Sequence, residues 1–499
     1  MAPGSRPSTL GRVARAGFQE LSEARDRIDG LAALLAEQAG GTANADVAPI
    51  NAETLLDAFA GAADPDIALA RLSELAERHP ELCAGFRASE WARLCRLAGA
   101  SPALAEFFVR NPRDLARLLR DGGRVPDAAE ARRELLAAVG ASDPAPGAVA
   151  EDQRVPIASS SDESAWNALR TRYRELLAEL MVADLERGSA AGEPGPFAEV
   201  AAALSDLAAA ALEAGLAVAR RRLLDGEGGP AVPVERVASA RLAVVAMGKC
   251  GARELNVVSD VDVVFVVGST DDDVLDGDAL IRVTTRLAGE LMRAIHDPAH
   301  EPPLWQVDAN LRPEGRQGAL VRSLASMLSY YERWAKAWEF QALLKARAVA
   351  GDLALGEEFV ERTRPMVWAS GSREDFVGSV QRMRRRVTEH IAEEDIHHQL
   401  KLGPGGLRDI EFSVQLLQLV HGQYDERLRL RGTLESLDAL VAGGYVARED
   451  GERLEADYAR LRLLEHRLQL RELRRTALMP RDPDGLRVLA RASGLAATA

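Results

Sequence analysis

The chain has 499 residues, of which 47% are hydrophobic and 28% charged, a composition typical of soluble globular proteins with more than one domain. Its formal net charge of −14 excludes a large nucleic-acid-binding surface, which would need a basic electrostatic field. Three cysteines without metal-ligand spacing and the lack of a secretory segment indicate a reducing, cytoplasmic setting, and the apolar stretch 200–218 contains two acidic residues that disfavour a membrane span.

The first part of the chain, residues 1–150, is predicted to be a helical domain, and residues 1–50 are expected to be partly flexible. From residue 51 to 120 apolar residues recur mostly at three-, four- and seven-residue steps, which predicts packed helices. Residues 141–163 are rich in Pro, Ser, Ala and charge without a sustained period, so they are predicted to be a linker.

A catalytic domain is predicted for residues 151–355 and a C-terminal helical bundle for residues 356–499. Two short β-branched runs separated by glycines indicate buried strands joined by a loop. The predicted elements of the catalytic domain are helices at 165–186 and 196–224, strands at 242–247 and 263–267, a helix at 277–296, a strand at 304–311 and a helix at 326–347.

Two carboxylates precede the apolar run of the second predicted strand, in the sequence Ser259-Asp260-Val261-Asp262. Because successive side chains of a strand alternate between its faces, Asp260 and Asp262 point the same way, roughly 6–7 Å apart. Like charges at that distance repel each other unless a cation lies between them. The flanking residues are too apolar for an exposed strand, so the pair predicts a metal site and not a solvated surface.

Asp308, in the third predicted strand, completes an acidic trio with Asp260 and Asp262. Such a trio can hold two Mg²⁺ ions about 3.5–4 Å apart and assist an in-line displacement at phosphorus. Oxygen ligands favour Mg²⁺, and the sequence has no paired His/Cys cluster that would indicate zinc. Upstream, glycines around Lys249 let backbone amides approach a phosphate, whose charge the lysine offsets.

Lysine is rare in this chain: only four of the 62 basic residues are lysines, namely Lys249, Lys336, Lys345 and Lys401. All four lie within or beside the motifs described next. Since Lys and Arg differ at anion sites, this placement indicates a functional use of lysine, and chance in an arginine-rich composition is the alternative.

Four motifs follow one another along the chain. They are G-K-x-G-x-x-E-L-N-x-x-S-D-x-D at 248–262, V-D-x-x-L-R-P-x-G-x-x-G-x-L at 307–320, W-E-x-x-A-L-x-K-A-R at 338–347 and KLGPGGLRDIEF at 401–412. Together they resemble the signature of the glutamine synthetase adenylyltransferase family, a branch of the DNA polymerase beta-like nucleotidyltransferase superfamily.

The resemblance implies an α+β fold, with a polymerase beta-like nucleotidyltransferase core that has a small mixed sheet and is flanked by two mostly α-helical domains. It also implies a longer protein with two catalytic halves: the C-terminal half attaches AMP to a tyrosine of glutamine synthetase, and the N-terminal half removes it by phosphorolysis and releases ADP. This chain begins with Met1, holds one catalytic set and has G-L-R-D-I-E at 406–411. We therefore expect it to be the N-terminal, deadenylylating half.

The resemblance also implies roles for motif residues. The expected catalytic and metal-binding residues are Asp260, Asp262 and Asp308. The expected nucleotide- and phosphate-binding residues are Gly248, Lys249, Gly251, Ser259, Arg312, Lys345, Arg408 and Glu411. Arg312 equally fits a structural pairing, and Arg408 and Glu411 equally fit interdomain salt bridges.

The implied cofactor is Mg²⁺, and the implied partners are glutamine synthetase, phosphate, ADP or ATP, and a PII signalling protein, without nucleic acid or membrane. Two alternatives stay open: the adenylylating half, which would transfer AMP from ATP, and a catalytically silent docking module on the same core. A nucleotidyltransferase acting on RNA or DNA fits the carboxylates but not the charge of −14.

Overall fold

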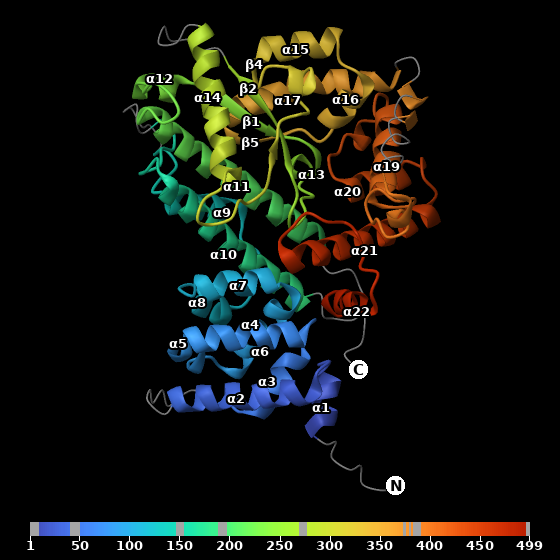
Figure 1. Ribbon diagram of the computed structural model, residues 1–499. Helices are drawn as coiled ribbons and strands as arrows, with labels where there is room; N and C mark the ends of the chain where they lie inside the picture. Colours follow the sequence, from blue (N-terminus) through green and yellow to red (C-terminus); the bar gives the residue numbers. More distant parts are fainter. Residues whose placement is uncertain are drawn as a thin grey trace. The chain divides into compact units, whose positions relative to one another are not determined.

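The computed structural model describes residues 9–39, 50–145, 154–187, 197–268, 277–372, 376–378, 381–382 and 391–495 (Figure 1). Contacts divide the chain into two compact units, each assembled from separate stretches: residues 1–125, 177–197 and 460–499 in the first, and residues 126–176 and 198–459 in the second. This division crosses the domain boundaries predicted near residues 150 and 355. Parts of the predicted flexible start and of the predicted linker, residues 1–8, 40–49 and 146–153, lie outside the described residues.

The first unit is built mainly from helices. Its elements are α1 (Thr9–Ala16), α2 (Leu21–Ala39), α3 (Ala52–Ala60), α4 (Pro65–Arg78), α5 (Pro80–Ala84), α6 (Ala88–Ala100), α7 (Pro102–Arg110), α8 (Leu115–Asp121), the end of α10 (Glu163–Arg187), the end of α21 (Arg448–Glu472) and α22 (Pro483–Ala492). A cavity of about 880 Å³ in this unit is lined by residues of α2, α4, α21 and α22, and none of the predicted site residues borders it.

Helix starts in the first unit follow from local capping chemistry. The side chains of Asp64 and Ser101 accept hydrogen bonds from Ile67 N (3.2 Å) and Leu104 N (3.3 Å), and each is followed by a proline at the first helical position. A capping oxygen satisfies an otherwise unpaired amide, and proline has no amide to satisfy there. Most of the apolar residues that predicted these helices are buried, as the complete burial of Phe59 illustrates.

The second unit contains the sheet. Its elements are α9 (Ala128–Ala138), the start of α10, α11 (Phe197–Leu224), α12 (Val234–Ser239), β1 (Leu242–Ala246), α13 (Gly248–Gly251), β2 (Val261–Val267), α14 (Gly277–His296), β3 (Val307–Asp308), η2 (Gly315–Gln317), β4 (Val321–Ser323), α15 (Leu324–Arg333), α16 (Ala337–Leu343), β5 (Arg347–Gly351), α17 (Leu353–Ala369), η3 (Ser370–Ser372), η4 (Glu393–Asp395), α19 (Leu407–His421), η5 (Glu426–Leu428), α20 (Thr433–Ala442) and the start of α21.

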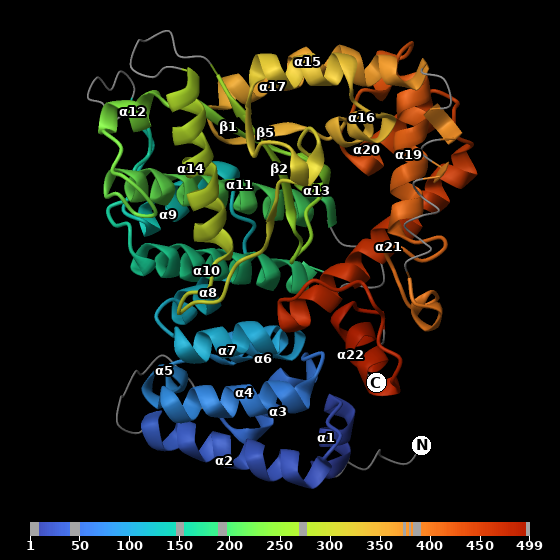
Figure 2. The same ribbon diagram turned by 45° about the horizontal axis from the view of Figure 1, so that its top comes forward.

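The five strands form one mixed sheet with the order β3-β2-β1-β5, and β4 also pairs with β2. Strand β1 is antiparallel to β2 and β5, whereas β3 and β4 run parallel to the beginning and the end of β2. Helix α17 runs across β1 and β5 (Figure 2). The α+β class predicted from the sequence is confirmed.

Both central strands are buried on both faces, which explains why their sequences are continuously apolar. On one face Val245 of β1 and Val264 of β2 pack in a core with Tyr331, Phe340 and Phe359 of helices α15, α16 and α17. Side chains of a strand alternate between its faces, so Asp262 belongs to the same face as Val264. The acidic position therefore lies on the face of the sheet that α15, α16 and α17 cover.

Two predicted elements are wrong in extent. The strand predicted at 304–311 is only Val307–Asp308, and the helix predicted at 326–347 is α15, then α16, then the start of β5. The break occurs where Glu339 Oε2 accepts a hydrogen bond from Lys336 N (2.8 Å) and begins a new helix. Strand β5 depends on pairing with β1, which is about a hundred residues away and leaves no local periodicity.

Helix α11 is long and apolar enough to cross a membrane by length and composition, and no other helix in the described ranges is. However, 83% of its most apolar window is buried within this structure. Buried core helices of globular proteins pass the same test, so this helix is weak evidence for a span.

Candidate active site

Asp262 and Asp308 are Cα partners in the parallel pairing of β2 with β3. A hydrogen bond from Val261 N to Gln306 O (2.9 Å) holds this pairing. Asp308 Oδ1 accepts a hydrogen bond from Asn310 N (2.7 Å), which turns the chain away from the strand. The structure thus brings together two carboxylates that are 46 residues apart in sequence, with Asp260 directly before β2.

The electrostatics of the pair are dominated by burial and like charge. Burial raises the pKa of Asp262 from 3.8 to about 6, and the neighbouring carboxylate of Asp308 is the next cause. Asp260 raises the pKa further, while Lys401 and Arg408 lower it. The site therefore concentrates negative charge that its own cations offset only in part.

Repelling carboxylate oxygens are the ligands that a divalent cation such as Mg²⁺ takes, so the donor set of Asp260, Asp262 and Asp308 fits such an ion. In the part of the chain that the structure describes, no three Asp, Glu, His or Cys side chains already stand in a metal-holding arrangement. The pairing of β2 with β3 brings the backbones of Asp262 and Asp308 together, although the three carboxylates do not converge on one point in the described structure.

The loop after β1 passes directly over Asp262. Met247 N donates to Asp262 O (2.8 Å), and the next residue, Gly248, has a left-handed φ of +53°. A Cβ at position 248 would lie only 2.6 Å from Asp262 Oδ2. The left-handed backbone conformation favours glycine here, and a Cβ would displace either the loop or the Asp262 carboxylate.

Two other predicted phosphate-binding residues have different surroundings. A Cβ at Gly251 would lie 2.0 Å from the carbonyl oxygen of Lys345, so this glycine permits close backbone packing between α13 and the segment before β5. Arg347 Nε also donates to the Gly251 carbonyl (3.2 Å). Ser259 lies half-buried in the segment before β2, next to Asp260.

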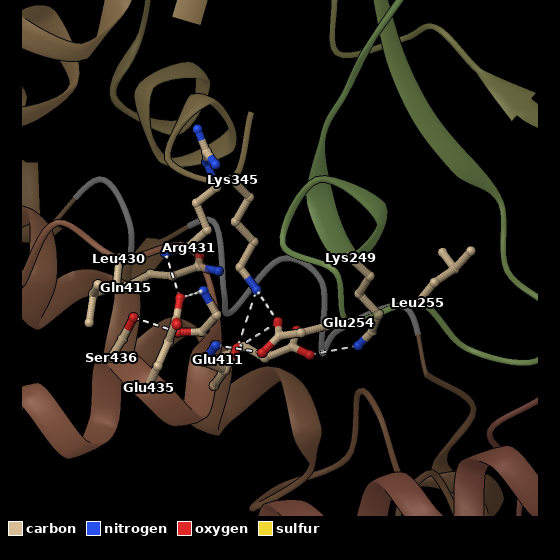
Figure 3. Close-up of polar contacts among 12 residues, drawn as sticks. Lys249, Glu254, Leu255, Lys345, Glu411, Gln415, Leu430, Arg431, Glu435 and Ser436 are labelled. Atoms are coloured by element: carbon tan, nitrogen blue, oxygen red, sulfur yellow. Dashed lines mark hydrogen bonds and ion pairs between the residues drawn. The ribbon is translucent and has the colours of Figure 1, made fainter. Parts of the chain in front are cut away.

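Both predicted anion-binding lysines form ion pairs with glutamates (Figure 3). Lys249 Nζ donates to Glu411 Oε1 of α19 at 2.6 Å, and Lys345 Nζ donates to Glu254 Oε2 at 2.8 Å. The side chain of Lys345 is only 6% exposed. In this arrangement Lys345 belongs to a buried network beneath the loop, whereas Lys249 bridges the loop to α19.

Arg312 binds the loop that follows β3. Its Nη1, Nε and Nη2 atoms donate to the carbonyl oxygens of Ala309 (2.8 Å), Gly318 (3.1 Å) and Arg316 (3.2 Å). These three bonds close the loop on itself, so the structure favours the structural role of Arg312 over direct contact with a phosphate.

Helix α19 supplies two of the predicted residues in its first two turns. Arg408 stacks over the ring of Phe412 at 5.3 Å, and its buried Nε has no hydrogen-bond partner within the described part of the chain. Glu411 is 7% exposed and accepts from the hydroxyl of Tyr458 (3.3 Å) as well as from Lys249. Arg408 is close enough to lower the pKa of Asp262, and Glu411 reaches the loop after β1 through Lys249.

One residue near the carboxylates was absent from the predicted site. Lys401 lowers the pKa of Asp262 more than any other cation does. Its carbonyl oxygen accepts a hydrogen bond from Arg408 N (3.0 Å), so the two cations are presented by one glycine-rich turn. The rarity of lysine in the sequence was the available signal for this residue.

Comparisons with known proteins identify the family of the chain. A family model described as glutamate–ammonia ligase adenylyltransferase matches residues 91–362, more than half of the chain, and a model described as GlnD PII-uridylyltransferase matches residues 381–499. Three relatives are named bifunctional glutamine synthetase adenylyltransferase/adenylyl-removing enzyme. They come from Leifsonia xyli (52% identical over 98% of this chain), Streptomyces coelicolor (43% over 99%) and Mycobacterium avium (46% over 88%).

The chain spans less than half of the length of these relatives, since the alignments cover 46%, 45% and 41% of them. The family model matches the segment that contains the β-sheet, the acidic strands and the loop over Asp262. This chain belongs to the glutamate–ammonia ligase adenylyltransferase family.

Proposed function

We propose that this chain is the adenylyl-removing half of a bifunctional enzyme and that it deadenylylates glutamine synthetase by Mg²⁺-dependent phosphorolysis. The observation that carries the proposal is the pairing of Asp262 with Asp308 beneath the glycine loop at Gly248. Such an arrangement suits a phosphoryl group held between carboxylate-bound cations and backbone amides. The names of the relatives support glutamine synthetase as the substrate.

In the proposed reaction an oxygen of inorganic phosphate attacks the phosphorus of the AMP group on a tyrosine. The new P–O bond makes ADP, the bond from phosphorus to the tyrosine oxygen breaks, and the phenolate takes up a proton. Mg²⁺ held by Asp260, Asp262 and Asp308 would supply positive charge for the phosphoryl oxygens. Lys401 and Arg408 add protein cations near the same carboxylates.

The direction of exchange is supported by the sequence G-L-R-D-I-E at 406–411, which places Arg408 at the start of α19. Arg408 is one of the two cations that lower the pKa of Asp262, and a cation here suits an incoming phosphate anion. The adenylylating direction is the competing proposal.

The test is to incubate the chain with adenylylated glutamine synthetase, phosphate and Mg²⁺ and to measure ADP. We expect ADP from the wild type and a large loss in Asp260→Asn. Transfer of AMP from ATP to unmodified glutamine synthetase would assign the chain to the adenylylating half, and neither activity would favour the silent docking module.

A PII signalling protein is proposed as a regulatory partner. The match of residues 381–499 to the PII-uridylyltransferase family supports this proposal, because the name of that family connects such a segment with PII. A pull-down with purified PII tests it, and failure to retain PII under any effector condition would oppose it.

A further inference from the structure

The loop between β1 and β2 contains a strained residue. Arg253 has a φ of +59°, a left-handed conformation that non-glycine residues rarely adopt. Such strain persists where the surroundings over-determine the backbone. Here Arg253 forms an ion pair with Asp206 of α11, and Leu255 N donates to the buried Ser205 Oγ at 3.0 Å.

Glu254, between these two anchors, makes the connection to the phosphate loop. Its backbone N donates to the carbonyl oxygen of Lys249 at 2.8 Å, which closes the turn that carries Lys249. Its carboxylate accepts from Lys345 Nζ (2.8 Å) and from both the hydroxyl (3.0 Å) and the backbone N of Thr433. Figure 3 shows Glu254 and Lys345 directed toward each other.

Thr433 is the first residue of α20, and its N-cap residue Gly432 has no side chain. The Glu254 carboxylate therefore supplies the oxygen that a capping side chain would provide, at the positive end of a helix. Glu435 Oε1 accepts from Gly432 N (2.7 Å) and from Arg431 N (3.1 Å), which fixes the start of α20 independently. Glu254 thus ties the loop to a firmly held partner.

A purely stabilising role explains this arrangement poorly. Glu254, Lys345 and Thr433 are 8%, 5% and 3% exposed, and burying an ion pair gives little net stability relative to apolar residues of similar size. A hydrogen-bonded buried pair instead holds the segments that carry its two residues in one conformation. The loop that it defines contains Gly248, whose position above Asp262 leaves no room for a Cβ.

We propose that Glu254 is a positioning residue, which holds the loop 248–255 against the catalytic carboxylates by binding Lys345 and the N-terminus of α20. The expected loss of kcat rests on the proposed function, whereas the expected loosening of the loop does not. Without the Glu254 carboxylate the loop keeps its covalent neighbours and loses its link to α20. Lys249 and Gly248 then sample positions in which the phosphoryl group is misaligned.

The experiment compares Glu254→Ala with the wild type by hydrogen exchange of the peptide covering 248–256 and by ADP release. We expect amide exchange in this peptide to rise at least tenfold. We also expect kcat to fall about 100-fold, while KM for adenylylated glutamine synthetase changes less than threefold. Glu254→Gln, which retains an acceptor for Thr433 N, should recover part of both losses.

The matched control is Glu290→Ala. Glu290 is also a buried carboxylate of the second unit (7% exposed), and it accepts from Arg222 Nε (2.6 Å) and Arg293 Nη1 (3.2 Å) in α11 and α14. This variant should lower the melting temperature similarly, without loosening 248–256 or changing kcat more than twofold. If Glu254→Ala does not fold, Thr433→Val takes its place, because it removes only the hydroxyl.

The outcomes separate the two proposals. Unchanged exchange in 248–256, or a kcat loss no greater than that of Glu290→Ala, would overturn the positioning role. If the wild type releases no ADP, the proposed function fails alone, and the hydrogen-exchange comparison still decides the role of Glu254.

Discussion

Gly248 and Asp262 lie so close that a Cβ on the glycine would be 2.6 Å from Oδ2 of the aspartate. Carbon and oxygen atoms without a bond do not approach that closely, so any other residue at position 248 must displace the loop or the carboxylate. This contact links the loop after β1 directly to strand β2, which carries Asp262, so adding a single methyl group at position 248 tests how closely the two must approach.

Gly248→Ala should therefore lose about 100-fold in the rate of ADP release, because a displacement of ~1 Å is enough to misalign reacting groups. Its stability should fall by about 1–2 kcal/mol from the left-handed backbone alone. Gly444→Ala is the matched control, since Gly444 has a φ of +76° but no atom lies within 4 Å of the position that its Cβ would take. Equal kinetic losses in the two variants would contradict the steric link to Asp262.

The sequence predicted the parts of the site that depend on local pattern. The acidic pair before an apolar run and the glycine loop ahead of it are both visible in one stretch of chain. The sequence did not predict elements that form only through pairing with distant residues. Strand β5 is the example, because its first residue continues the predicted helix at 326–347 and the strand forms by pairing with β1. The sequence also could not separate Lys345, buried against Glu254, from Lys401 near Asp262, because motif membership does not reveal which lysine faces the carboxylates.

Asp262 should make metal-free protein less stable as the pH rises. Its pKa is about 6 in the folded state, against an ordinary value of 3.8, so between these values the folded protein binds more protons than the unfolded chain. The stabilisation is complete below about pH 4 and lost as the pH rises through 6, with a total on the order of 2–3 kcal/mol. Urea unfolding with EDTA at pH 4–7 measures it.

Asp262→Asn provides the reference for this pH dependence, because the amide resembles the protonated acid and does not titrate. The difference in unfolding free energy between wild type and Asp262→Asn should change in favour of the variant as the pH increases. Adding Mg²⁺ should stabilise the wild type more at pH 7 than at pH 5, since the cation competes with the proton. Parallel pH curves for the two proteins would show that Asp262 is not perturbed.

The ion pair between Lys249 and Glu411 should show strong coupling in the free energy of unfolding, as largely buried ion pairs do. The two side chains are 11% and 9% exposed, so removing one partner leaves the other largely buried charge without its counter-ion and costs about 3–5 kcal/mol. Lys249→Met and Glu411→Leu combined should cost less than either single change. A double-mutant cycle by urea unfolding measures the coupling, and additive losses would exclude it.

The exposed pair of Arg362 and Glu358 is the control for that cycle. Its N–O distance is 3.3 Å, but the side chains are 58% and 49% exposed. Solvent screens such a pair, so its coupling should be only about 0–1 kcal/mol.

Lys401 should contribute to phosphate binding although it lies outside the set predicted from the motifs. Among the cations near Asp262 it has the largest effect on that pKa, and it is presented together with Arg408 by the turn before α19. Lys401→Met should raise KM for phosphate about tenfold, equivalent to about 1.4 kcal/mol, and leave KM for adenylylated glutamine synthetase unchanged. This variant should also raise the pKa of Asp262 further, because a compensating positive charge is lost.

Lys336→Met is the control, since Lys336 is exposed and the hydrogen bond that begins α16 comes from its backbone N and not from its side chain. If both variants have the same KM for phosphate, the charge of Lys401 acts on Asp262 without reaching the bound anion.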